Sequence, residues 1–464
     1  MRDGTVMRNL IGDRKFYRRL FAVALPIMLQ NGISNFVSLL DNIMVGKLGT
    51  EQMSGVSIVN QLIFIFFLCL FGAVGGTGIF TAQYAGQKND EGIRHTFRFK
   101  MILGLIILGL FAFIFVTFDT QLISLYLHEG SKEGDLLATL AYGKEYMAVM
   151  LIGLIPCVFE QVYSSTMREC GETVVPMIAS VIAVFINLGL NYVLIFGNFG
   201  APELGVIGAA MATNISRFIQ AFIVMGYVHT HAKKQTYIVG MYRSLRVPAG
   251  LVRKMLFMAA PLILNETLWA AGIATLTQVY SVRGLSVVAG MNINSTIYNV
   301  FNIAFIAMGD AVAIIVGQLL GAGKLEEGRE TAYRIIAFST VMCFGIGALL
   351  YLLAPLFPMI YNTTDEVREI ATGIIKVSAI MMPVGGFLHS TYFTIRSGGK
   401  TLITFLFDSV FQWVVTVPVA FVLIHFTGMS IFMAFFLVEA TNLIKSLIGW
   451  IIMRSGVWMQ TIVE

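Results

Sequence analysis

Residues 52–87 read QMSGVSIVNQLIFIFFLCLFGAVGGTGIFTAQYAGQ, and no charged residue interrupts them. Roughly 20 apolar residues suffice to cross the hydrocarbon core of a bilayer. The stretch is longer than one ordinary span, so it predicts a single membrane helix with interfacial ends. Further uncharged runs occupy residues 21–40, 173–202, 335–364 and 377–395.

The composition agrees with a polytopic membrane protein. Of the 464 residues, 57% are hydrophobic and 12% are charged, whereas soluble domains carry about 25% charged residues. We expect an all-α protein with twelve transmembrane helices. The predicted spans are 17–45, 54–82, 99–127, 138–165, 173–197, 206–229, 253–282, 288–318, 332–361, 368–395, 401–426 and 429–453.

Basic residues are unevenly distributed between these spans. They gather before the first span, after the second, between the sixth and seventh, and after the eighth. A twelve-span count places all four segments on one side of the membrane. Because cytoplasmic loops carry an excess of Lys and Arg, both termini are expected in the cytoplasm. The net charge of +5 is therefore no indication of nucleic-acid binding.

The chain repeats itself at a fixed offset. The separation between Pro26 and Pro261 is the same as that between Gly49 and Gly284. Each repeat holds six spans, so both halves have the same orientation and a pseudo-two-fold axis along the membrane normal is expected. The predicted organisation is a six-helix lobe over residues 1–230, a basic cytoplasmic linker over 231–252, and a second six-helix lobe over 253–464. A cleft between the lobes would open to alternate sides of the membrane.

Asp41 is a carboxylate in an otherwise apolar span. Acids inside a membrane usually face the bundle interior and serve an ion or substrate path. At about 100° per residue, Asp41 shares one helix face with Asn31, Ser34 and Ser38. The alternative is that Asp41 lies near the outer end of the span and meets water.

Two amides stand four residues apart in the fifth span. Asn187 and Asn191 therefore share one helix face. Amide oxygens beside a carboxylate suit a hard cation such as sodium, so a sodium ion at Asp41, Asn187 and Asn191 is one expectation. Ordinary hydrogen bonding between helices is the other. Thr213 is a weaker candidate for the same site, since small residues there can simply permit close packing.

Further acids lie inside the predicted spans of both halves. Glu266 is an intramembrane carboxylate of the second half, which could carry a proton or could be a structural acid. Glu439 is another, and Arg217 and Lys445 are basic residues that could pair with such acids. The candidate substrate cavity is assigned to Asn31, Ser34, Ser38, Glu160, Gln278, Asp310 and Asp408.

The cysteine and histidine content indicates no metal centre. The four cysteines are scattered, mostly in apolar runs, and have neither metal-ligand spacing nor a disulfide framework. We expect no cofactor beyond a coupling cation, Na⁺ or H⁺, and no enzymatic activity. Asp41 and Glu266 fall in different halves without a protease motif, which disfavours an intramembrane hydrolase.

Four motifs in order resemble the multidrug and toxic compound extrusion (MATE) family across nearly the whole chain. They are LPIMLQNGISNFVSLLDNIMVGKLG (25–49), MRECGET (167–173), NLGLNYVLIFG (187–197) and PELGVIGAAMAT (202–213). The resemblance implies a V-shaped monomer in a prokaryotic cytoplasmic membrane that exports organic, often cationic, drug-like molecules in exchange for sodium ions or protons. It also implies that Asp41, Asn187, Asn191 and Thr213 form the cation site.

The chain departs from the family pattern at two places. One branch has Asp where this chain has Asn191, and the NorM branch has a second-lobe acid where this chain has only His389. Sodium and proton coupling both stay open, because an Asp with amide neighbours suits either cation. Glu266 matches the span-seven acid of the NorM branch in type, but it lies nearer the Pro of its helix than in that branch and is a less direct match. The alternative function is a lipid-linked oligosaccharide flippase, whose cavity is strongly cationic by resemblance, whereas the intramembrane charges here are mostly acidic. A structural scaffold would have no need of so many buried acids.

Overall fold

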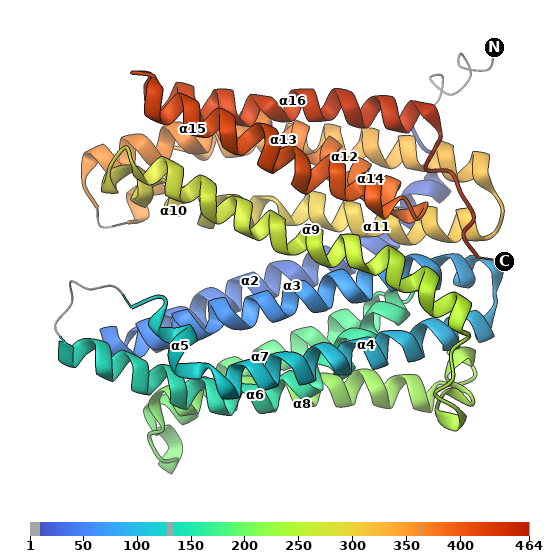
Figure 1. Cartoon of the computed structure of the whole chain (residues 1–464), viewed down its shortest axis with the longest axis horizontal. Helices are drawn as coiled ribbons and strands as arrows, with labels where there is room; N and C mark the ends of the chain where they lie inside the picture. The colour runs from blue at the N-terminus through green and yellow to red at the C-terminus, as the bar shows by residue number, and fades with distance from the viewer. Residues whose placement is uncertain (1–9, 128–132, 362, 464) are drawn as a thin grey trace. The chain divides into compact units, whose positions relative to one another are not determined.

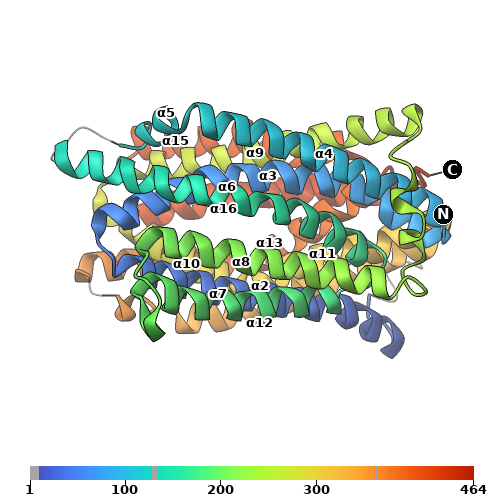
Figure 2. The same ribbon diagram turned by 90° about the horizontal axis from the view of Figure 1, so that it is seen from below.

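The computed structural model describes residues 10–127, 133–361 and 363–463, and every regular element in those ranges is helical (Figures 1 and 2). Twelve of these described helices are long and apolar enough to cross a membrane, which confirms the predicted fold class. They are α2 (Arg14–Gly46), α3 (Thr50–Gln87), α4 (Asp90–Thr117), α6 (Glu133–Glu169), α7 (Val174–Phe196), α8 (Gly205–Thr230), α9 (Ala249–Ser281), α11 (Ile303–Gly321), α12 (Leu325–Leu353), α13 (Asp365–Ser397), the segment Thr401–Phe426, and α16 (Ile431–Ser455).

The internal repeat of the sequence reappears in the helix boundaries. The offset between Pro26 and Pro261 also relates both ends of α2 to both ends of α9, and the start of α4 to the start of α12. The turns that follow α2 and α9 use Gly49 and Gly284, with φ angles of 144° and 115°. Side chains rarely adopt such φ values, so both repeats require glycine at this turn.

The third membrane helix lies closer to the N-terminus of the chain than the span that the sequence predicted. The sequence suggested 99–127, but α4 covers Asp90–Thr117. Its N-terminus is capped by Asn89, whose side chain accepts a hydrogen bond from the Gly92 N–H at 2.9 Å. The basic residues of this segment therefore lie in the helix. Among them, Lys100 is 1% exposed and is paired with Glu169 of α6.

Two other spans depart from a plain α-helix. The predicted span 288–318 is divided at Asn302 into α10 (Leu285–Phe301) and α11. Asn302 follows several other asparagines, whose side chains compete with the backbone for hydrogen bonds and weaken a helix. The eleventh span consists of α14 (Thr401–Phe405), the π-helical turns η5 (Leu406–Val410) and η6 (Gln412–Thr416), and α15 (Val417–Phe426).

The contacts within the chain define two compact units. Unit 1 comprises Met1–Met28, Ala82–Lys88 and Phe257–Glu464, and unit 2 comprises Leu29–Thr81 and Asn89–Leu256. Helices α2 and α3 each contribute residues to both units. The lobe boundaries inferred from the sequence repeat stay a prediction.

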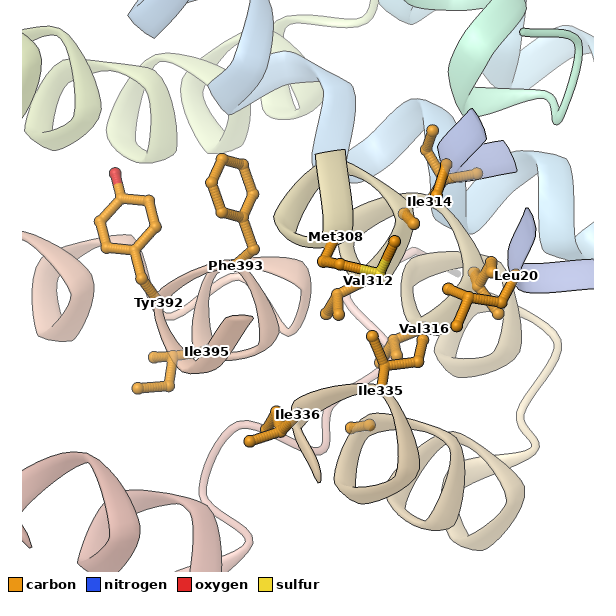
Figure 3. Packing of buried hydrophobic residues seen from close by; sticks show 14 of the residues in the cluster. Leu20, Met308, Val312, Ile314, Val316, Ile335, Ile336, Tyr392, Phe393 and Ile395 are labelled. Atoms are coloured by element: carbon orange, nitrogen blue, oxygen red, sulfur yellow. The ribbon is translucent and has the colours of Figure 1, made fainter. Parts of the chain in front are cut away.

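One apolar core of unit 1 is built around α11. Figure 3 shows Leu20 of α2 beside Ile314 and Val316 of α11, with Ile335 of α12 close by. Leu20, Val316 and Ile335 are each 0% exposed. The first turns of α2 are thereby fixed to unit 1 by apolar packing.

The end of α3 meets the end of α11 in unit 1 through two glycines at equivalent places in the repeat. A Cβ atom on Gly86 would lie 1.9 Å from the carbonyl oxygen of Gln318, and one on Gly321 would lie 2.0 Å from that of Gln83. Small residues allow such close backbone approach between membrane helices. The side chain of Gln83 also donates to the carbonyl oxygens of Ser397 and Gln460, both at 3.1 Å.

The segment between α8 and α9 is docked on unit 2. Arg98 of α4 donates to the carbonyl oxygens of Met241 at 2.9 Å, Gly240 at 3.1 Å and Arg246 at 3.4 Å. Lys234 pairs with Glu172, and the hydrogen bond that it donates to this carboxylate raises the pKa of Lys234. The basic linker thus has defined contacts with the helices of its own unit.

Candidate functional site

Four residues singled out from the sequence meet inside unit 2. Asp41 lies in α2, Asn187 and Asn191 lie in α7, and Thr213 lies in α8. The Nδ2 of Asn191 donates to Oδ1 of Asp41 at 2.7 Å. Asn187 is 7% exposed and Asn191 is 2% exposed. Because Asn187 and Asn191 are four residues apart, one face of α7 presents both amides to the carboxylate.

The amide of Asn187 bridges Asp41 and Thr213. One of its terminal atoms lies 3.1 and 2.8 Å from the two carboxylate oxygens of Asp41, and the other lies 3.3 Å from Oγ1 of Thr213. Hydrogen bonding favours the orientation in which the nitrogen donates to Asp41 and the oxygen accepts from Thr213. In the reverse orientation, the Asn187 oxygen joins the two carboxylate oxygens in a cluster that suits a hard cation.

The amide oxygen of Asn191 is in a position to bind a further partner at the site. The Oδ1 of Asn191 is buried and has no hydrogen-bond partner in the part of the chain that the structure describes. Leaving a buried polar atom unpaired costs roughly 1–3 kcal/mol. A carboxylate, two amide oxygens and a hydroxyl are the donor types that sodium takes, so the residues present fit a sodium ion. The same carboxylate also fits a proton.

Sequence reasoning missed Tyr146 as a neighbour of this site. Tyr146 of α6 is 4% exposed and donates to Oδ1 of Asn60 at 3.2 Å. The charges of Arg217 and Asp41 both act on its hydroxyl, and the Arg217 guanidinium lies over the ring of Phe67 at 5.3 Å. A tyrosine in an apolar helix gives no sequence signal for such a position.

The polar stripe of α2 is less uniform than its helical spacing suggested. Asn31 and Ser34 are half-buried, whereas Ser38 is exposed. Neighbouring Gln30 accepts a hydrogen bond from Arg168 at 3.3 Å. On α6, Glu160 accepts from Ser164 at 2.6 Å. Whether these side chains line a substrate cavity stays a prediction.

A second polar network lies in unit 1, around Asp408 in the π-helical turn η5. Lys445 of α16 pairs with Asp408 at 2.5 Å, and Asn265 of α9 donates to Asp408 at 3.2 Å. Asn265 is 1% exposed, and its Oδ1 accepts from the Ser409 N–H at 3.3 Å and hydroxyl at 2.7 Å. The sequence offered Lys445 as a partner for some acid, but it did not single out Asn265.

Glu266 belongs to the same network in unit 1. It is hydrogen-bonded to Tyr392, and the charges of Arg396 and Asp408 act on it. The Tyr392 hydroxyl also accepts from Asn265 at 3.2 Å, and in Figure 3 it points away from Ile395. Of the other second-half candidates, Gln278 is exposed and Asp310 is half-buried in α11.

Comparisons with known proteins give one consistent result. The family model MatE matches residues 26–193 and 261–422. The chain is 25% identical over 452 residues to "Probable multidrug resistance protein NorM" of Thermotoga maritima, covering 95% of this chain and 93% of the relative. It is 24% identical to "Probable multidrug resistance protein YoeA" of Bacillus subtilis, covering 89% and 88%.

Solved structures show the same fold. A crystal structure of the Vibrio cholerae MATE transporter VcmN matches with a TM-score of 0.86 at 19% identity, over 96% of this chain and 97% of that one. A structure described as the outward-facing conformation of a multidrug resistance MATE family transporter matches with a TM-score of 0.84 at 19% identity, over 98% and 99%.

Proposed function

The chain belongs to the MatE family, and we propose that it is a secondary active efflux antiporter for organic, often cationic, drug-like compounds. The observation that carries the proposal is the cluster of Asp41, Asn187, Asn191 and Thr213 in unit 2. The names of the two bacterial relatives, both probable multidrug resistance proteins, support the substrate class. Inward-moving sodium ions or protons supply the driving force.

The cluster can hold a cation because its carboxylate has replaceable partners. Asp41 accepts a hydrogen bond from Asn191 at 2.7 Å, which stabilises its negative charge. A bound sodium ion or proton would neutralise that charge in its place. The Asn187 amide can then turn its oxygen toward the cation while its nitrogen donates to Thr213. Sodium would be held by Asp41, Asn187, Asn191 and Thr213, and a proton would be held by Asp41 alone.

Exchange requires that the cation and the drug favour different states of the protein. Each ligand can shift such an equilibrium only by its differential affinity for the two states. Helix α2 carries Asp41, and Pro26 in the same helix has no N–H for the carbonyl four residues earlier. We place the conformational response to cation binding in a bend of α2 near Pro26.

The test is efflux of a fluorescent organic cation from liposomes that contain the purified protein. The dye is loaded inside, and a sodium gradient or a pH gradient is imposed separately. Wild type should export the dye under one of the two gradients. Asp41→Asn should reduce that efflux at least about tenfold, because the amide can neither bind a proton nor neutralise sodium.

A matched control is Asp119→Asn, which removes an acid of unit 2 outside the spans. Asp119 pairs with Lys144 at 3.2 Å near the surface, so this variant should transport like wild type. Full efflux by Asp41→Asn contradicts the proposed role of Asp41. Absence of wild-type efflux under both gradients contradicts antiport and makes a lipid-linked oligosaccharide the next substrate to test.

A further inference from the structure

Asp408 of unit 1 and Asp41 of unit 2 have similar surroundings. Each is an acid inside a membrane span, and each accepts a hydrogen bond from an asparagine of another helix. Asn265 of α9 donates to Oδ2 of Asp408 at 3.2 Å. Asn191 of α7 donates to Oδ1 of Asp41 at 2.7 Å. Both units therefore contain a carboxylate and a buried amide, from which a site for a monovalent cation can be built.

In unit 1, a lysine supplies the cation for this carboxylate. The Lys445 Nζ lies 2.5 Å from Oδ1 of Asp408, so Lys445 and Asn265 each contact one carboxylate oxygen. The side chains of Lys445 and Asp408 are only 12% and 19% exposed, so solvent screens their attraction little. The ammonium also lies over the Phe407 ring at 5.3 Å, a contact that favours a cation. The place that a free cation would take beside Asp408 is thus filled by the protein itself.

Close packing of α16 against the π-helical turn η5 holds the ammonium at Asp408. A Cβ atom on Gly449, one turn beyond Lys445, would lie 3.1 Å from the Phe407 ring. The small residue allows the two segments to approach closely. π-helical turns within membrane or soluble helices frequently lie at functional sites, and η5 is the turn that contains Asp408.

The amide oxygens of the two asparagines differ in their availability. The Oδ1 of Asn265 accepts from the Ser409 N–H at 3.3 Å and from the Ser409 hydroxyl at 2.7 Å. The Oδ1 of Asn191 is buried and has no hydrogen-bond partner among the residues that the structure describes. Unit 2 therefore keeps an oxygen that can coordinate a cation, whereas the corresponding oxygen of unit 1 is already engaged.

The charges around the two acids support the same distinction. In unit 1, the charge of Arg396 acts on Glu266, and Lys445 pairs with Asp408. Two acids of this network are thus matched by two cations. In unit 2, Asp41 has no ion pair within the described ranges of the chain, and its hydrogen bond comes from a neutral amide. An uncompensated carboxylate inside a membrane is costly, so Asp41 requires a cation from outside the protein and Asp408 does not.

We propose that Lys445 is a tethered replacement for a second coupling cation. Its ammonium occupies the cation position beside Asp408 and Asn265, so only the site at Asp41 binds and releases a cation during transport. One monovalent cation is then exchanged for each drug molecule. This consequence for transport rests on the proposed antiport, whereas the occupation of unit 1 by Lys445 does not.

Sodium binding to purified protein tests the occupation of unit 1. The measurement uses radioactive sodium at alkaline pH, where protons compete least, and an Asp41→Asn background, which removes the site in unit 2. Adding Lys445→Gln leaves Asp408 among amides, as Asp41 is in the wild type. We expect no sodium binding by Asp41→Asn and about one ion per protein for Asp41→Asn/Lys445→Gln. Adding Asp408→Asn should abolish this binding again.

The matched control is Lys445→Arg, which keeps the tethered charge and should bind no sodium in the same background. Thermal unfolding keeps the test decisive if Lys445→Gln weakens the fold. Sodium, compared with choline, should raise the Tm of Asp41→Asn/Lys445→Gln by at least about 2 °C, because it binds only the folded state. It should leave the Tm of Asp41→Asn/Lys445→Arg unchanged. Sodium binding by Asp41→Asn alone, or no effect of sodium on Asp41→Asn/Lys445→Gln in either measurement, overturns the proposal.

The ratio of coupled fluxes in liposomes tests the consequence for transport. Wild type should take up about one cation for each molecule of a singly charged dye that it exports, an exchange that moves no net charge. A membrane potential imposed with potassium and valinomycin should therefore leave the steady-state dye gradient unchanged. A ratio of about two, with a dye gradient that responds to the potential, overturns the one-cation cycle. Absence of wild-type efflux would instead contradict the proposed antiport, and the sodium binding of the Asp41→Asn variants would still decide the role of Lys445.

Discussion

Replacing Asn191 by aspartate places a second carboxylate beside Asp41. In the structure, the Asn191 Nδ2 lies 2.7 Å from Oδ1 of Asp41, and the substitution changes the side-chain shape little. Two negative charges at that separation repel by about 6 kcal/mol at an effective dielectric constant of about 20. This energy corresponds to about four orders of magnitude in an equilibrium constant. The pair should therefore share one proton over a wide range of pH.

Infrared spectroscopy of the purified variant measures this proton through the absorption of protonated carboxyl groups. The Asn191→Asp variant should keep one carboxyl protonated at pH values where the double variant Asp41→Asn/Asn191→Asp is fully ionised. Sodium binding to Asn191→Asp should weaken about tenfold for each unit of acidification, because each sodium ion must displace that proton. Loss of the last proton at the same pH in the single and the double variant would refute the proximity of the two side chains.

Three other regions of the molecule give further tests. Lys100→Met should destabilise the protein by about 3–5 kcal/mol in denaturant unfolding, since it removes the buried cation that pairs with the Glu169 carboxylate; adding Glu169→Gln should restore most of the loss, and no restoration contradicts the pairing. Gly86→Val should lower stability by at least about 1–3 kcal/mol, because its Cβ would lie 1.9 Å from the Gln318 carbonyl oxygen; wild-type stability would contradict this contact. Lys233→Cys, in a background without the four native cysteines, should resist a membrane-impermeant maleimide applied to intact cells; rapid labelling would contradict a cytoplasmic linker.

The fold was largely predictable because membrane helices must satisfy their backbone internally. Long uncharged runs such as 52–87 therefore indicated helices directly, and the constant offset between matching prolines and glycines joined them into two repeats. The predicted third span begins too late because charged residues in a membrane protein ordinarily indicate a loop outside the bilayer. Lys100 is in fact neutralised within the bundle by Glu169, which lets the helix begin at Asp90 instead of residue 99.

The sequence predicted more of the polar network in unit 2 than of the one in unit 1. Asp41, Asn187 and Asn191 could be grouped because helical spacing places both amides on one face of α7, toward any acid that packs there. The network of unit 1 depends on which helices neighbour α9 and on the π-helical turns around Asp408. Helical periodicity carries neither kind of information, so the pairing of Asp408 with Lys445 and Asn265 was found only in the structure.

The most direct test of cation–drug exchange is counterflow in sealed vesicles without any initial ion gradient. An imposed gradient of the organic cation should drive sodium ions or protons in the opposite direction, since coupling between two ligands is reciprocal. Flux of one of these ions in wild type, and its loss in Asp41→Asn but not in Asp119→Asn, is the result that the account predicts. Movement of the organic cation without any opposing ion flux would contradict it.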